Sequence, residues 1–358
     1  MKGDKMTDKE LLVLQNELAE AIKGASENPE ASVAKLMKLK EKTEGTVTKA
    51  ESYIVSAMIY ESIGDVWMKV KKPDKAEQSY MEMMKVSLKL YEMDKEKYDF
   101  RLGFAYYKRA NFYRTMLGCA VLTPTSKTFT EHQKKMFTVA EGLYKNAIAC
   151  TMRKQMPMRY VDLHANVMSE LSVLYACVGD YEKAIACGKD GVKLDKAIYE
   201  KRDDKTQSFR LATRMNSLAT IYTFTKDIQL VMETIEDAIY VLEEHEEEDP
   251  IAFGAMLARN YMTLAGSYSQ LEEEASKAEE TYQIGLKRMI AVNEKSNNKL
   301  INDVITSYMM VGDYYKRVKK EESAKAHYCL AMKMASDLFQ KTKNPIYENL
   351  MKRLQPYI

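Results

Sequence analysis

Apolar side chains recur every three or four residues along most of the chain, and polar side chains fill the positions between them. Tyr53, Ala57, Tyr60, Gly64 and Trp67 follow this spacing in one stretch. Such a spacing places the side chains on one face of an α-helix, whereas a half-buried β-strand alternates apolar and polar residues. Almost no stretch alternates over the length of a strand. The pattern therefore predicts an all-α chain.

The few helix breakers mark where these helices begin and end. The chain of 358 residues has only 14 Gly and 7 Pro, which disfavours turn-rich sandwiches, barrels and nucleotide-binding α/β folds. Most prolines stand in polar stretches between apolar-periodic segments, where they act as helix boundaries. These prolines are Pro29, Pro73, Pro124, Pro157, Pro250, Pro345 and Pro356.

A short signature recurs six times: a small residue is followed three positions later by an aromatic one. The small residues are Gly64, Ala110, Ser172, Ala219, Ala265 and Gly312, spaced 46, 62, 47, 46 and 47 apart. The aromatic residues are Trp67, Tyr113, Tyr175, Tyr222, Tyr268 and Tyr315. A near-constant period of this length is typical of a repeat array of helical hairpins, in which each unit is covered by its neighbours.

The signature resembles that of the tetratricopeptide repeat family over roughly residues 46–340. Two copies fit its two-helix pattern best, with Tyr60, Ile63, Gly64, Trp67, Ala76 and Tyr80 in one and Tyr308, Val311, Gly312, Tyr315, Ala324, Tyr328 and Ala331 in the other. The resemblance implies a right-handed α-solenoid. The family's usual unit is about 34 residues, so the longer period here implies longer helices, similar to the elongated repeats of kinesin light chains and of Gram-positive peptide-pheromone receptors.

Three segments follow from this interpretation. Residues 1–45 form an N-terminal helical hairpin cap with helices over 7–23 and 30–42, residues 46–345 form the repeat array, and residues 346–358 form a C-terminal capping helix. The one long spacing places an insertion near 117–134. We interpret the insertion either as a tolerated surface loop or as a lid or docking element beside a groove.

Charge and composition narrow the functional classes. The formal net charge of +2 gives no field that would attract nucleic acid or an anionic membrane. No apolar run approaches the roughly 18 residues needed to span a bilayer, and the first residues lack a signal-peptide core, so we expect a cytoplasmic protein. Five cysteines without a Cys-x-x-Cys pair predict neither a disulfide framework nor a metal site. No phosphate loop, dinucleotide fingerprint or nucleophile elbow is present, so we expect no cofactor and no catalytic residues.

The resemblance also implies where a partner would bind, because in this family the first helix of each hairpin lines a concave face. Asn and Arg side chains there can bind the carbonyls and carboxylates of a peptide, and an Arg and Asn pair is expected to recur at the same place in three of the units. The alternative is that these are solvated helix faces. The candidates are Tyr107, Arg109, Asn111, Arg114, Asn166, Arg214, Asn216, Arg259 and Asn260. Among the methionines, Met262 and Met309 occupy first-helix positions that could face the same groove.

We therefore predict a non-catalytic scaffold that binds a peptide or protein segment. The alternative is a ligand-gated, peptide-sensing regulator that controls an effector protein, as the resemblance to pheromone receptors implies. No residue pattern in the sequence supports an enzyme. The sequence is compatible with a homodimer.

Overall fold

The computed structural model describes residues 8–44, 47–119, 129–152 and 157–358. All regular elements in these ranges are helices, which confirms the predicted all-α fold. The chain forms two compact units, residues 1–194 and 195–358. Each is described by itself below.

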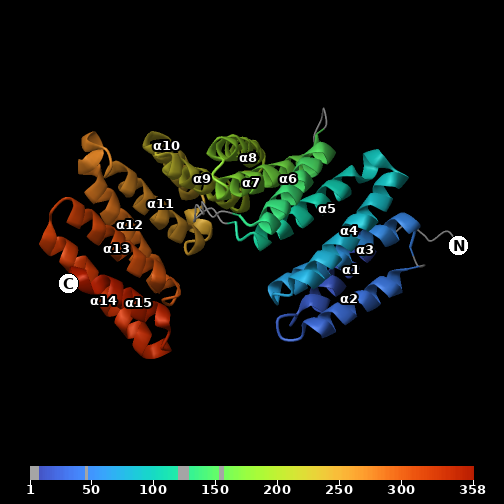
Figure 1. The fold of residues 1–358 in the computed structure, drawn as a ribbon, viewed down its shortest axis with the longest axis horizontal. Helices are drawn as coiled ribbons and strands as arrows, with labels where there is room; N and C mark the ends of the chain where they lie inside the picture. The colour runs from blue at the N-terminus through green and yellow to red at the C-terminus, as the bar shows by residue number, and fades with distance from the viewer. Residues whose placement is uncertain (1–7, 45–46, 120–128, 153–156) are drawn as a thin grey trace. The chain divides into compact units, whose positions relative to one another are not determined.

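The first unit is a series of helices that pack on their neighbours in the sequence (Figure 1). It contains α1 (Asp8–Ile22), α2 (Pro29–Thr43), α3 (Lys49–Lys69), α4 (Pro73–Met93), α5 (Lys95–Met116), α6 (Glu131–Thr151), α7 (Met158–Cys177) and the beginning of α8 (Tyr181–Arg202).

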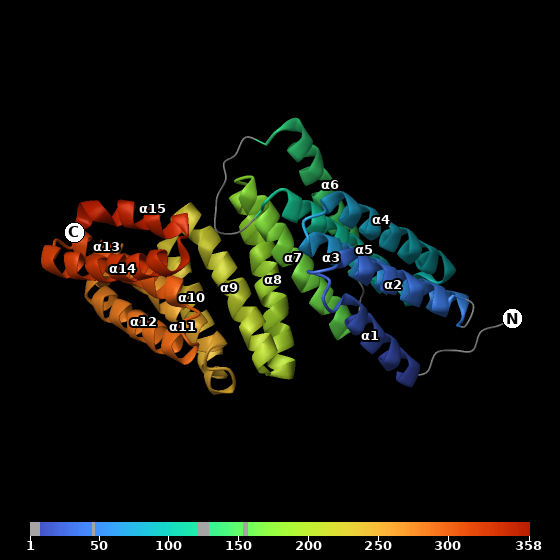
Figure 2. The same cartoon turned by 90° about the horizontal axis from the view of Figure 1, so that it is seen from below.

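The second unit continues the same arrangement. It contains the end of α8, then α9 (Lys205–Thr225), α10 (Ile228–Glu243), η1 (Glu246–Glu248), α11 (Ala252–Tyr268), η2 (Glu272–Glu274), α12 (Ala275–Lys295), α13 (Ile301–Arg317), α14 (Glu321–Thr342), α15 (Pro345–Leu354) and η3 (Gln355–Tyr357). The pairs α11/α12 and α13/α14 lie side by side in both Figure 1 and Figure 2.

Local sequence fixes many of the helix starts. Pro29 and Pro73 occupy the first turns of α2 and α4, where proline's missing N–H costs nothing. Thr48 begins α3 with a capping box, because its side chain accepts from the Glu51 N–H and Glu51 accepts from the Thr48 N–H. The breakers thus act as the boundaries that their positions in the sequence predict.

The small residues of the signature lie where two helices of a hairpin approach closely. We call α3, α5, α7, α9, α11 and α13, which carry these residues, the first helices, and α4, α6, α8, α10, α12 and α14 the second helices. A Cβ added to Gly64 of α3 would lie 2.5 Å from Cε1 of Tyr80 on α4. A Cβ added to Gly312 of α13 would likewise lie 2.8 Å from Cε1 of Tyr328 on α14. Glycine therefore leaves room for the tyrosine ring at both crossings, because any larger side chain would force the ring or the helix to shift.

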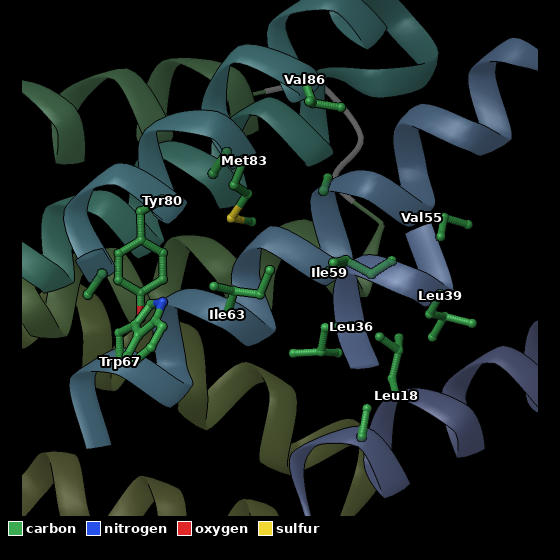
Figure 3. Packing of buried hydrophobic residues seen from close by; sticks show 14 of the residues in the cluster. Leu18, Leu36, Leu39, Val55, Ile59, Ile63, Trp67, Tyr80, Met83 and Val86 are labelled. Carbon is green, nitrogen blue, oxygen red and sulfur yellow. The ribbon is translucent and has the colours of Figure 1, made fainter. Parts of the chain in front are cut away.

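Apolar side chains from consecutive helices form the core of each unit. Figure 3 shows the cluster in the first unit, where Leu18 and Leu36 from the N-terminal hairpin and Ile59 from α3 lie on one side and Trp67 and Tyr80 on the other. The N-terminal hairpin thus shares its core with the first signature-bearing hairpin, as a repeat array requires.

The helices expected at 7–23 and 30–42 correspond to α1 and α2. The division into cap, array and capping helix stays a prediction. The insertion expected near 117–134 falls between α5 and α6, and residues 120–128 lie outside the described residues. Its alternative interpretations therefore both stay open.

Candidate functional site

Charged side chains connect the first helices of successive hairpins. In the first unit, Lys108 of α5 lies 2.9 Å from an oxygen of Asp65 and 3.1 Å from one of Glu61, both on α3. Arg114, near the end of α5, pairs with Glu170 of α7 at 2.7 Å. The first helices therefore form one layer of the unit, and Arg114 lies within it.

The second unit repeats this kind of connection. The Nε atom of Arg259 on α11 donates to Asp303 of α13 at 2.9 Å. Arg259 is about half exposed, so part of its guanidinium surface remains accessible on this layer.

Burial shifts the titration of these groups. It raises the pKa of Glu61, against the influence of Lys108. Burial by itself would lower the pKa of Lys108, but the carboxylates of Glu61 and Asp65 together raise it. Burial opposes the charged form of Arg114 in the same way, and Glu170 is the main group that raises its pKa. Carboxylates on a neighbouring first helix thus favour the charged forms of Lys108 and Arg114.

Aromatic side chains form a stripe along α5. Phe104 lies 6.4 Å from Phe100 and 6.2 Å from Tyr107 between ring centroids, and all three are half-buried. Tyr107 also lies 6.4 Å from Tyr144 of α6, whose hydroxyl donates to the Asn111 side chain. Tyr107 and Asn111 therefore stand beside each other, and both contact the second helix of their own hairpin.

Arg109 contacts a different second helix from Tyr107 and Asn111. Its guanidinium contacts the Met84 sulfur on α4 at 3.6 Å and lies over the ring of Tyr113. It therefore packs against the second helix of the preceding hairpin. Asn166 is half-buried on α7.

Two candidates lie in the core of the second unit. Arg214 is 8% exposed and forms an ion pair with Asp195 of α8, which Arg210 also contacts at 2.8 Å. Asn260 is 2% exposed, and its Nδ2 has no hydrogen-bond partner among the described residues. Asn216 is half-buried with its Oδ1 enclosed and unpaired in the described part of the chain. As placed in the structure, Arg214 and Asn260 are enclosed by their own unit and do not present a surface to a partner.

The Arg and Asn pairs also occupy different turns, contrary to the expectation that they recur at the same place. Arg109 and Asn111 flank the small residue of α5, whereas Arg214 and Asn216 precede that of α9 by five and three residues. The two pairs therefore differ by four residues, which is about one helical turn, so they lie on similar faces of their helices one turn apart. Arg259 and Asn260 precede Ala265 of α11 by six and five residues, which places this third pair on another face. The structure brings Tyr107, Asn111 and Arg114 near one another along α5 of the first unit, whereas Arg214 and Asn260 are buried in the second unit.

The two candidate methionines, Met262 and Met309, also differ in burial. Met262 is buried against Gly285 of α12, where its sulfur would lie 2.9 Å from an added Cβ. Met309 is half-buried and lines a cavity between α13 and α15.

Sequence reasoning missed a second recurring interaction, in which the signature tyrosine donates to a glutamate of the preceding second helix. Burial first, and Glu236 second, raise the pKa of Tyr268 to about 12, so its hydroxyl stays protonated. The glutamate directly follows the small or apolar residue of the second helix, a signal that the sequence contains. The pairs are Tyr113 with Glu77, Tyr175 with Glu141, Tyr268 with Glu236 and Tyr315 with Glu279.

Within the described residues, no three His, Cys, Asp or Glu side chains gather as metal ligands would. Among the described helices, none has the length and apolar character needed to cross a membrane.

These features define a helical-hairpin repeat protein in which charged side chains join first helices within each unit. No protein-family model and no curated protein sequence matches the chain.

Solved structures nevertheless share its fold. The apo form of RapI superposes with a TM-score of 0.59 at 11% identity, over 96% of this chain and 86% of that one. BtubC (BKLC) from P. vanneervenii gives 0.54 at 17%, over 74% and 92%. A signal transduction ATPase with a tetratricopeptide repeat sensor from Pyrococcus horikoshii gives 0.57 at 16% over 97% of this chain, which spans 45% of that protein. The chain has the tetratricopeptide-type fold that its signature predicted.

Proposed function

We propose that this protein is a non-catalytic scaffold that binds a polypeptide segment through its first helices. The observation that carries the proposal is the surface along α5, where half-buried Phe104, Tyr107, Asn111 and Arg114 follow one another. Aromatic surface and fixed polar side chains on rigid helices are what recognition of a peptide needs. The near-zero net charge gives no reason to propose nucleic acid or membrane as the partner, and a cytoplasmic location agrees with this role.

A position-specific crosslinking experiment tests the proposal. The photoreactive residue p-benzoylphenylalanine replaces Tyr107 or Arg259 on first helices, and Leu88 or Tyr240 on second helices as exposed controls. The four full-length variants are irradiated in native cell extract. We expect polypeptide adducts of defined mass at the two first-helix positions and none at the controls. Adducts of equal yield at all four positions, or at the controls alone, would refute the proposed binding layer.

The similarity to RapI, whose structure is that of an apo form, favours a ligand-gated regulator as the second candidate. In that case a bound peptide would change the conformation that an effector protein recognises. Small-angle scattering of the full chain with and without the crosslinked polypeptide distinguishes the two candidates. A change in the radius of gyration beyond the added mass supports the regulator, and an unchanged value supports the scaffold.

A further inference from the structure

A cavity separates α13 and α15 in the second unit. Both helices pack on α14, and between them lies an open slot of about 350 Å³. We call this cavity the α13–α15 slot. Its volume falls at the lower end of those that hold small ligands or single side chains of a partner.

The floor and walls of the slot are apolar. Ile305 is buried at its base, while Met309 and Met310 of α13 and Leu350 of α15 are half-buried. Ile346 is 67% exposed at the edge. Methionine and leucine side chains at such a site adapt to apolar groups of different shape, and covering Ile346 would remove apolar surface from water.

The polar groups lie at the two ends of the slot. At one end, the Tyr347 hydroxyl donates to Asn302 Oδ1 at 3.0 Å and joins the two helices. At the other end, Asp313 already accepts from the Tyr328 hydroxyl at 2.6 Å. Arg353 also lines the slot and is exposed. Its guanidinium forms no ion pair or hydrogen bond with any described residue, so Arg353 is the cation in the slot that is open to an anionic partner, whereas the Asp313 carboxylate is already engaged by a hydroxyl.

We propose that the α13–α15 slot binds a polypeptide segment with one large apolar side chain followed by a residue that carries a carboxylate. The apolar side chain enters between Met309 and Leu350, and the carboxylate pairs with Arg353. This inference rests on the proposed polypeptide-binding function and names the chemistry of one contact. It places that contact on α13 and α15 of the second unit.

The chemistry of the slot predicts which of three capped dipeptides binds there most tightly. Acetyl-Leu-Glu-amide supplies both features, acetyl-Ala-Glu-amide lacks the large side chain, and acetyl-Leu-Lys-amide reverses the charge. Full-length protein labelled with ¹³C at the methionine methyl groups reports binding directly, because Met309 and Met310 line the slot. Their two signals are assigned from the spectra of Met309→Leu and Met310→Leu. We expect the Leu-Glu probe to shift both signals most, and the other two probes to shift them less at equal concentration.

One pair of variants tests the position of the site. Thr306 is exposed and lines the slot, so Thr306→Trp fills it without disturbing the core. Thr263→Trp is the matched control, since Thr263 is an exposed threonine on α11 and also donates to the carbonyl four residues earlier. We expect Thr306→Trp to abolish the shifts caused by the Leu-Glu probe and Thr263→Trp to leave them unchanged.

A second pair tests the charge. Arg353→Glu reverses the cation in the slot, whereas Lys352→Glu makes the same change on the neighbouring exposed residue, which pairs with Glu348 outside the slot. An exposed ion pair changes affinity by up to about fivefold. We therefore expect Arg353→Glu to weaken the Leu-Glu probe about threefold to fivefold and to strengthen the Leu-Lys probe, and Lys352→Glu to change either less than twofold.

The result that overturns the inference is an absence of shifts at Met309 and Met310 with the Leu-Glu probe, or shifts that persist unchanged in Thr306→Trp. If the first-helix crosslinks to a polypeptide still form in that case, the proposed function stands and only the slot assignment fails. If those crosslinks are absent as well, both fail together.

Discussion

The close approach of α3 and α4 at Gly64 offers a direct test of the packing that defines the repeat. In Gly64→Ala the new Cβ would lie 2.5, 2.7 and 2.8 Å from Cε1, Cζ and Cδ1 of the Tyr80 ring. That ring is buried, is held by a 2.5 Å hydrogen bond from its hydroxyl to Asp65, and packs 6.0 Å from Phe112. The ring therefore cannot move aside without breaking other contacts.

The magnitude follows from two opposing effects. Overpacking a buried site costs about 1 to 3 kcal/mol, and replacing a helical glycine by alanine gains about 0.5 to 1 kcal/mol. We expect Gly64→Ala to lower the free energy of unfolding by about 1 to 2 kcal/mol. Gly142 of α6 is the matched control, because nothing lies within 4 Å of a Cβ added there. Gly142→Ala should raise the free energy of unfolding by about 0.5 to 1 kcal/mol.

Urea denaturation followed by circular dichroism measures both variants against the wild type. The mechanism is checked by combining Gly64→Ala with Tyr80→Leu, which removes the ring that the new methyl group meets. In that background the alanine should be neutral or stabilising. If Gly64→Ala is as stable as the wild type, or is equally destabilising with and without the ring, the close crossing does not explain the glycine.

Three further predictions concern two ion pairs, one histidine and one buried amide. Asp195→Asn leaves two guanidinium groups without their buried partner and should lower the free energy of unfolding by about 3 to 5 kcal/mol. Asp303→Asn breaks a half-exposed ion pair and should lower it by less than about 1 kcal/mol. Equal losses for the two variants in urea denaturation would contradict this prediction. The hydrogen bond to a nearby glutamate raises the pKa of His245, whereas partial burial opposes the shift. The stability that protonated His245 contributes is therefore present below about pH 6.5. It is lost as the pH rises through the pKa of His245 in the folded state. The difference in unfolding free energy between the wild type and His245→Gln should therefore shrink from pH 5.5 to pH 8, and a constant difference would rule this out. Asn260→Leu replaces a buried amide, whose Nδ2 has no partner among the described residues, by an apolar group of similar size and should not lower the melting temperature. A large decrease would show that the amide makes a stabilising hydrogen bond.

Much of the fold could be predicted from the sequence because the repeat imposes strong local requirements. A glycine or alanine is needed where two helices cross, and an aromatic residue is needed to fill the space beside it. Gly64, Trp67 and Tyr80 satisfy these requirements within one unit of sequence, and Gly312 repeats them with its own tyrosine. Proline at helix starts supplied the boundaries.

The candidate site was less predictable, because residue type does not determine which way a side chain points. Arg214 and Asn260 have the chemistry of groove residues, yet their positions on α9 and α11 turn them into the core. The tyrosine–glutamate hydrogen bonds could not be predicted from the sequence, because each joins two hairpins. The partner of each tyrosine is evident only when the hairpins are stacked. The α13–α15 slot depends on how far apart two helices stand, and no spacing in the sequence encodes that distance.

Hydrogen exchange of the full chain, with and without the polypeptide captured at the first-helix positions, tests the proposed binding layer most directly. The captured segment is added as a synthetic peptide, and exchange is followed by mass spectrometry. We expect the peptide to slow exchange in α5, α11 and α13 and to leave α4, α10 and α12 unchanged. Slowed exchange confined to the second helices, or no change in any helix at saturating peptide, would contradict the proposal that the first helices bind the partner.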